Sequence, residues 1–353
     1  MSTKRRTEEM VALDREHVIH PMSGYKRSPG VVLEEGQGIR VRDTEGREYL
    51  DFIAGLLCVN VGYGRQELAE AAAAQMKKLS YATAFWGFTN PANVECAEKL
   101  KELTPAGLDH FLFCSGGSEA IESALKIARL YWQGRGIRKY KIIALHNSYH
   151  GLTYGAMSAT AYGHKALSTN FEPLVPGFVH IPCYHCYRCS FGLTYPECDT
   201  ACARFLEETI VNEQEGTVAA FLAEPVQGSG GMIPSPPTYW PLVRQICSEH
   251  KVLLIADEVM TGFGRTGQLF AVEHWGVRPD IMTMAKGITS GYVPMAAVAL
   301  SDSVFQGLTE GAPFFIHGFT YTGHPVGSAV AVKNMEIIVR EKLPENAARQ
   351  GQY

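Results

Sequence analysis

The chain has 353 residues, of which 46% are apolar and 19% charged, as in ordinary globular proteins of about two or three domains. Its net charge of −4 produces no overall basic field, which argues against nucleic acid and anionic membranes as partners. No apolar stretch reaches the roughly 18 residues that cross a bilayer, and residues 1–10 lack the apolar core of a signal peptide, so we expect a cytoplasmic protein.

The first 70 residues differ in pattern from those that follow. They contain GIRVRDTEGREYLDF, which predicts two short strands joined by a turn at residues 43–46. We expect residues 1–70 to contribute to a separate small lobe.

Between about residues 70 and 300, short apolar runs alternate with longer segments of helical period. The runs are HFLFC, KIIALHNSY, FVHIP, VAAFLAEPV, VLLIADEV, DIMTMAK and MAAVALS. This alternation predicts an α/β fold with a mostly parallel sheet and helices on both faces. One helix is expected over residues 118–132, where apolar side chains recur at helical spacing and acids lie near the start.

Ligands of open parallel sheets bind where the strands end, so the residues just after each run are candidates for chemistry. After HFLFC, the small residues from Ser115 to Ser118 lead into the predicted helix, whose free backbone N–H groups can bind a phosphate. A serine N-cap is the alternative. In ALHNSYHG, Tyr149 can stack on a flat cofactor and His150 can act as a base, with packing at the edge of the core as the alternative.

Carboxylates follow two further strands. Glu224 ends VAAFLAEPV, and Asp257 and Glu258 end VLLIADEV. Adjacent strand residues point to opposite faces, so at most one of this pair faces a given site, and an acid that merely caps a loop is the alternative. The glycines of TGFGRTG match a dinucleotide-binding pattern, but we interpret them as turn glycines because the next segment does not predict a helix.

Lys286 follows DIMTMA directly and precedes a glycine. Most lysines are solvated surface charges, but burial at a strand end would lower the pKa of this amine, and imine formation needs a neutral amine. A lysine, an anion site, an aromatic ring and a carboxylate are thus expected at one sheet edge. Pyridoxal phosphate requires that set, with the acid keeping its pyridine nitrogen protonated.

These residues and their surroundings resemble those of class III (omega) aminotransferases, which use pyridoxal phosphate on fold type I, and in particular the branch that acts on amines and omega-amino acids with pyruvate. The resemblance runs from LDFIAGLLCVNVGYG at residues 50–64 to HGFTYTGHP at residues 317–325, and DEVMTGFGRTG and TMAKGITSG are its most specific blocks. It implies a seven-stranded sheet in a large cofactor-binding domain at residues 71–325. Residues 326–353 would begin a C-terminal small domain that is mostly absent.

The resemblance also implies roles for single residues. Lys286 would bond to the cofactor aldehyde and then carry a proton between the substrate carbon and the cofactor. Asp257 would bind the pyridine nitrogen, and the ring would lie between Val259 and Tyr149.

Further implied roles concern the phosphate and the substrate. Gly117 and Ser118 would hold the cofactor phosphate. Thr320 would reach the phosphate of the neighbouring subunit, so that a homodimer is part of the site. Glu224 would lie near the substrate.

The sequence departs from the family pattern in three ways. Met260 replaces a glutamine that contacts the phenolic oxygen of the cofactor in several relatives, and Leu57 replaces a frequent tryptophan at the pocket entrance. The family also continues into a domain with an arginine that binds substrate carboxylates. We expect this chain to be a fragment of a longer protein, because the alternative, a natural short form, would leave apolar surface uncovered.

One cysteine-rich segment, PCYHCYRCSFGLTYPECDTACARFLEE, stands outside this pattern. Cys183, Cys186, Cys189, Cys198 and Cys202 can supply thiolates to zinc, but zinc sites usually show two clearer pairs. We therefore predict a reduced loop insertion and no metal site, with zinc as the alternative.

We predict a transaminase that uses pyridoxal phosphate to move an amino group from an amine or omega-amino acid to a 2-oxo acid, with pyruvate expected and 2-oxoglutarate as the other acceptor. A decarboxylase or an aminomutase on the same scaffold is one alternative. A non-catalytic, cysteine-rich metal or redox protein is the other.

Overall fold

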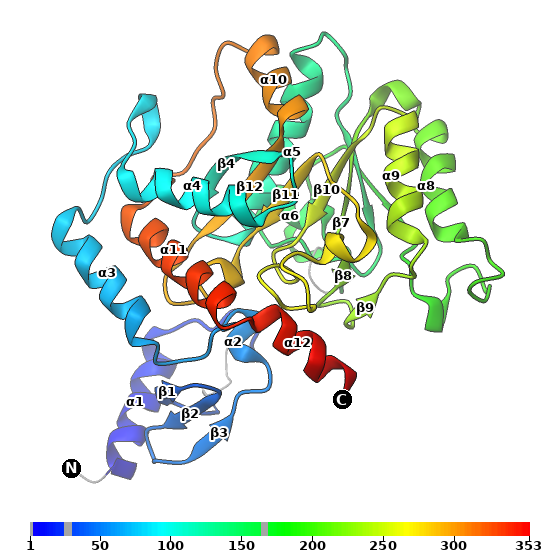
Figure 1. Cartoon of the computed structure of the whole chain (residues 1–353). Helices are drawn as coiled ribbons and strands as arrows, with labels where there is room; N and C mark the ends of the chain where they lie inside the picture. The colour runs from blue at the N-terminus through cyan, green and yellow to red at the C-terminus, as the bar shows by residue number, and fades with distance from the viewer. Residues whose placement is uncertain (1–2, 25–29, 164–168) are drawn as a thin grey trace.

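A seven-stranded sheet forms the centre of the computed structural model (Figure 1), which describes residues 3–24, 30–163 and 169–353. Its strands, in spatial order, are β4 (Leu108–Cys114), β12 (Ala296–Ser301), β11 (Ile281–Met284), β10 (Leu253–Asp257), β7 (Val218–Ala223), β5 (Lys141–Leu145) and β6 (Phe178–Ile181). β12 runs antiparallel to both neighbours, and all other pairs are parallel. Each strand coincides with one of the seven apolar runs, with β4 beginning two residues before its run, so the predicted fold class is confirmed.

Helices cover both faces of the sheet. Alternate strand residues enter two separate apolar clusters, with Ile142 and Leu222 in one and Ile143 and Phe221 in the other. The helices packed on the first face are α5 (Gly117–Gln133), α6 (Tyr154–Ala159) and α10 (Asp302–Gly311). Those on the second face include α4 (Pro91–Leu103), α8 (Ala201–Asn212) and α9 (Tyr239–Glu249).

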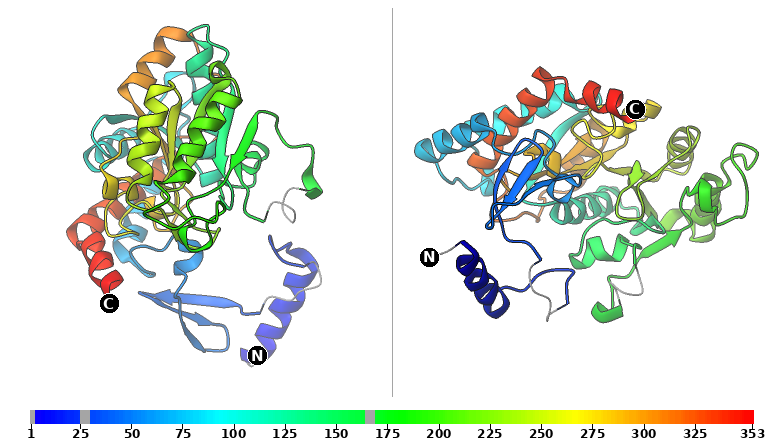
Figure 2. Two further views of the ribbon diagram at one scale, coloured as in Figure 1. Left: turned by 90° about the vertical axis from the view of Figure 1, so that its right-hand side faces the viewer. Right: turned by 90° about the horizontal axis from the view of Figure 1, so that it is seen from below.

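A small three-stranded sheet and an N-terminal helix form a lobe that lies below the large sheet in Figure 1 and in the left view of Figure 2. Its elements are α1 (Thr3–His17), β1 (Leu33–Gln37), β2 (Arg40–Asp43) and β3 (Glu48–Leu50). The expected hairpin is present as β2 and β3, and Asp43 Oδ1 stabilises its turn by accepting from the backbone N–H groups of Glu45 and Arg47. β1 was not expected, because its mostly polar and exposed residues lack the alternation of a half-buried strand.

The remaining segments connect the lobe to the large sheet and complete the second face. They are α2 (Ala54–Leu57), α3 (Gln66–Lys78), α11 (Pro325–Arg340), α12 (Leu343–Gln352) and the short strands β8 (Val226–Gln227) and β9 (Ile233–Pro234). α11 packs against α3 and α4. The helix predicted over residues 118–132 from its apolar stripe is confirmed as α5. No described helix combines the length and apolarity that a membrane span requires.

Candidate active site

A cavity of about 510 Å³ lies where the parallel strands of the large sheet end. The predicted site residues that line it are Gly117, Ser118, Tyr149, Glu224, Asp257, Val259 and Lys286. They come from the ends of five different strands, as expected for an open α/β sheet. Thr320 is the one predicted site residue outside this lining.

Lys286 follows β11 and opens a short helical turn, Lys286–Ile288. Its backbone is left-handed, with φ of +46°, which a non-glycine residue rarely adopts. Burial lowers the pKa of its amine, while the carboxylates of Asp257 and Glu224 act in the opposite direction. The net direction agrees with the sequence argument, because a lower pKa increases the fraction of neutral, nucleophilic amine.

Asp257 is held by three partners at the end of β10. Its Oδ2 accepts a 2.7 Å hydrogen bond from His150 Nδ1, and its Oδ1 accepts from Thr283 Oγ1 and from the backbone N–H of Val259, each at 3.1 Å. Both the aspartate and the histidine are buried. The carboxylate is therefore fixed in orientation, and His150 is engaged with it through Nδ1 and not simply packed at the core edge.

The neighbouring Glu258 points away from this cavity, as the alternation of strand residues predicts. Its Oε1 accepts from the backbone N–H of Val272 at 2.8 Å, and its other oxygen accepts from the hydroxyl of Thr261. Burial raises its pKa to about 7. Only one of the two adjacent acids, Asp257, is available to the site.

The N-terminus of α5 provides the expected anion cradle. Gly116 is the N-cap, in extended conformation and without a side-chain cap hydrogen bond, so the alternative of a serine N-cap is wrong. A Cβ atom on Gly117 would lie 2.9 Å from Val259 Cγ1, so a larger residue here would force Val259 or the helix start to shift. Uncapped N–H groups at the positive end of a helix favour a phosphate.

Tyr149 and Glu224 form a second polar wall. Glu224 Oε1 accepts from the backbone N–H of Tyr149 at 2.9 Å, and Oε2 accepts from the backbone N–H of Gly228 at 2.8 Å. Burial raises the pKa of this carboxyl to about 7. Glu224 thus holds the backbone that carries the Tyr149 ring, in addition to lining the cavity.

The departures from the family pattern also lie at this cavity. Leu57 and Met260 both line it. A Cβ atom on Gly228 would approach Met260 Sδ to 2.2 Å, so this glycine leaves room for the thioether. Met22 and Leu56 line the cavity as well. Strand-end reasoning missed those two residues because they belong to the N-terminal segment and follow no strand of the large sheet.

Thr320 is exposed, and its backbone carbonyl accepts a 2.9 Å hydrogen bond from Tyr81 Oη. The five clustered cysteines are free thiols and line a small cavity of about 20 Å³. Within residues 3–24, 30–163 and 169–353, no three histidine, cysteine or acidic side chains are arranged to hold a metal ion. The zinc alternative therefore gains no support from the arrangement of these thiols.

The residues of the cavity fit pyridoxal phosphate. The start of α5 presents backbone N–H groups without a side-chain cap, which suit a phosphate, and Asp257 presents a fixed, buried carboxylate. Lys286 supplies an amine of lowered pKa to the same cavity. Fold and site together define an enzyme of the pyridoxal-phosphate-dependent, fold type I class.

Comparison with known proteins identifies the family. A family model described as aminotransferase class-III matches residues 22–353. A putrescine–pyruvate aminotransferase of Pseudomonas aeruginosa is 41% identical over 347 residues, which cover 97% of this chain and 75% of that protein. The chain belongs to the class-III aminotransferase family.

Solved structures agree with this assignment. A thermostable (S)-enantioselective omega-transaminase from Thermomicrobium roseum superimposes with a TM-score of 0.94 at 46% identity, covering 98% of this chain and 78% of that one. An amine transaminase from an uncultivated Pseudomonas species, described in its PLP-bound form, gives 0.91 at 38% identity, with coverage of 95% and 77%. The protein is an aminotransferase that depends on pyridoxal phosphate. A decarboxylase, an aminomutase or a non-catalytic metal protein is not favoured.

Proposed function

We propose that this protein transfers an amino group from a primary amine or omega-amino acid to a 2-oxo acid, with pyruvate as the acceptor. The observation that carries the proposal is the convergence of Lys286, Asp257 and the α5 N-terminus on one cavity. Apolar neighbours, among them Leu57, Val259 and Met260, favour the hydrocarbon part of an amine donor. The similarity to a putrescine–pyruvate aminotransferase supports pyruvate as acceptor.

Each predicted residue has a proposed task in this site. Pyridoxal phosphate, when bound, supplies an electron sink for the substrate carbon. Lys286 would bond to its aldehyde and, once displaced by the substrate amine, would move the proton at the substrate carbon. Asp257, oriented by His150, would hold the proton on the pyridine nitrogen.

The walls of the cavity would bind and orient the cofactor. Gly117 and Ser118 would bind the phosphate with backbone N–H groups, while Tyr149 and Val259 would enclose the ring. Glu224 would keep Tyr149 in place through its backbone hydrogen bond.

We also propose a homodimer in which Thr320 completes the phosphate site of the partner subunit. Its exposure and its absence from the residues that line its own cavity support this role. Trp86, which is 88% exposed, and Ile316, which is 92% exposed, add uncovered apolar surface of the kind that subunit interfaces bury. A cytoplasmic location is likewise proposed, supported by the free thiols of the described cysteines.

An assay of amine donors with pyruvate tests the reaction. We expect alanine to form from at least one amine or omega-amino acid, and we expect Lys286→Ala to abolish both this activity and the visible absorbance of the bound cofactor. Release of carbon dioxide without alanine, or full activity in Lys286→Ala, would contradict the proposal. If only 2-oxoglutarate accepts the amino group in this assay, the acceptor is 2-oxoglutarate and not pyruvate.

Mixed dimers test the proposed task of Thr320. A Lys286→Ala subunit and a Thr320→Val subunit each carry one defect, but a heterodimer places an intact Lys286 opposite an intact Thr320. We expect co-expression of the two variants to restore cofactor affinity at one site per dimer. If sedimentation shows that dimers form but cofactor affinity is not restored, Thr320 does not contribute to the phosphate site of the partner subunit.

A further inference from the structure

The turn that carries Lys286 is tied to α11. The carbonyl oxygens of Gly287 and Ile288 accept hydrogen bonds from Asn334 Nδ2, at 2.8 and 3.0 Å. Asn334 is fully buried in α11, and its Oδ1 has no hydrogen-bond partner among the described residues. Among the described residues, the side-chain amide of Asn334 therefore makes hydrogen bonds only through its N–H donors. Both of these bonds go to the two residues that follow Lys286.

A second asparagine packs against the same turn. Asn60 Nδ2 donates to the carbonyl oxygen of Phe263 at 3.0 Å, and the guanidinium of Arg265 donates to Asn60 Oδ1. A methyl group on Gly287 would come within 2.6 Å of Asn60 Nδ2, so this asparagine packs directly against the turn. Two segments far apart in the sequence thus enclose one short stretch of backbone.

We propose that Asn334 and Asn60 are positioning residues for Lys286, holding its turn in the left-handed conformation that directs the amine into the active-site cavity. The inference rests on the proposed role of Lys286 in binding the cofactor. Neither asparagine is among the described residues that line the cavity, so both act through the backbone. A left-handed lysine is sterically unfavourable by itself, and it persists where its surroundings enforce it.

The pKa of the Lys286 amine depends on how this turn holds the side chain. The amine is buried, which lowers its pKa, and Asp257, Glu224 and Cys58 raise the pKa while Arg265 lowers it. The turn also has backbone hydrogen bonds of its own, such as that from the Ile288 N–H to the Ala285 carbonyl at 3.1 Å. We expect loss of the asparagine contacts to relax the turn and to move the amine toward water. Its pKa would then rise toward the ordinary lysine value of about 10.4.

Chemical labelling of Lys286 in the cofactor-free protein tests the proposal without relying on turnover. The rate of acetylation at Lys286 is followed by mass spectrometry over a range of pH for Asn334→Asp, Asn334→Leu and Asn60→Ala. The matched control is Ser328→Ala, which removes another buried polar group of α11 whose Oγ has no partner among the described residues. Thermal unfolding of all four variants reports general destabilisation.

We expect the labelling midpoint to rise by about one unit in the asparagine variants and to stay unchanged in the control. With saturating cofactor, kcat should fall by about 100-fold, as for a small displacement of a reacting group. If Asn334→Leu does not fold, Asn60→Ala, at a half-buried position, carries the test.

Unchanged midpoints in folded Asn334→Asp and Asn60→Ala would overturn the proposal. Failure of this proposal can be told apart from failure of the proposed function, because the latter would appear as full activity in Lys286→Ala. The labelling midpoints would still answer the question about the turn in that case.

Discussion

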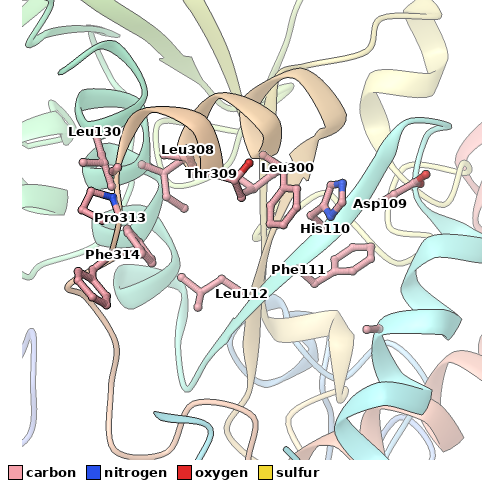
Figure 3. Close-up of a pocket in the computed structure, with 15 residues that line it drawn as sticks. Asp109, His110, Phe111, Leu112, Leu130, Leu300, Leu308, Thr309, Pro313 and Phe314 are labelled. Carbon is pink, nitrogen blue, oxygen red and sulfur yellow. The ribbon is translucent and has the colours of Figure 1, made fainter. Parts of the chain in front are cut away.

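Two cavities of this protein have similar size but differ in the chemical groups that line them. The larger, of about 610 Å³, lies beside the edge strand β4, and Figure 3 shows Phe111, Leu112, Leu308 and Phe314 around it. The smaller, of about 510 Å³, collects the lysine, the carboxylates and the helix N-terminus described above. Size and apolar lining therefore do not mark the active site, whereas the convergence of unlike polar groups with shifted pKa values does.

The same two elements line both cavities. The N-terminal turn of α5 faces the active site with its backbone N–H groups, while Ile127 and Leu130 near the other end of that helix line the apolar cavity. β4 likewise leads into Ser115 at the active site and places Phe111 in the apolar one. The difference arises because helix ends and strand ends expose polar backbone, and their middles do not.

The largest effect should come from Lys286→Ala. We expect kcat/KM for amino transfer to fall by at least about 10⁴-fold, because both the bond to the cofactor and the mobile proton are lost. Thr309→Ala, on the rim of the apolar cavity, is the control and should leave kcat/KM unchanged. Equal losses of kcat/KM in Lys286→Ala and Thr309→Ala would show that the two cavities do not differ in their importance for the reaction.

Asp257→Ala should reduce kcat by about 10²- to 10⁴-fold. The substitution removes the carboxylate proposed to hold the pyridine proton and leaves His150 without its buried partner. Steady-state kinetics with added cofactor measure the effect. A loss confined to cofactor affinity, with normal kcat at saturation, would limit Asp257 to a binding role.

Glu258, which follows Asp257 and points away from the active-site cavity, is expected to make the stability of the protein depend on pH. Between the ordinary glutamate pKa of about 4.3 and the folded value of about 7, the folded protein keeps a proton that the unfolded chain has lost. The free energy of unfolding should therefore fall as pH rises through this window.

Glu258→Gln should remove this pH dependence, which amounts to about 4 kcal/mol at most over the whole window. Denaturant unfolding at about pH 5 and about pH 8 measures it. Glu249→Gln, at an exposed glutamate, is the control. An unaltered slope in Glu258→Gln would show that its carboxyl titrates normally.

Gly117→Ala should weaken cofactor binding by about tenfold, because the added methyl group meets Val259 and displaces the cradle from the phosphate. Titration of cofactor-free protein followed by absorbance gives the Kd. Gly216→Ala, where a Cβ atom meets nothing within 4 Å, is the matched control. Equal affinities in the two variants would exclude a close approach of the phosphate at Gly117.

The smallest effect is expected in the apolar cavity. Phe305 stacks on His110 with ring centroids 3.8 Å apart. Phe305→Ala should lower the free energy of unfolding by about 1 kcal/mol and leave kcat per folded enzyme unchanged. A large loss of kcat would connect this cavity to the reaction.

Much of the sheet was predictable because its strands are buried on both faces and read as apolar runs. The position of Lys286, Asp257 and Tyr149 at strand ends followed from the same runs. β1 had no such signal, and the antiparallel direction of β12 left no mark in its composition. Strand direction depends on which neighbour the chain pairs with, which a local pattern does not contain.

The sequence by itself determined the strands of the large sheet, the helix α5 and the residue types that stand at the edge of the sheet, because apolar periodicity is a local property. Only the tertiary structure decided which side chains meet there. His150 and Asp257 are 107 positions apart, and Asn334 reaches the turn after Lys286 from 47 positions away. Such contacts depend on how layers pack, so physical chemistry assigns them once the chain is folded.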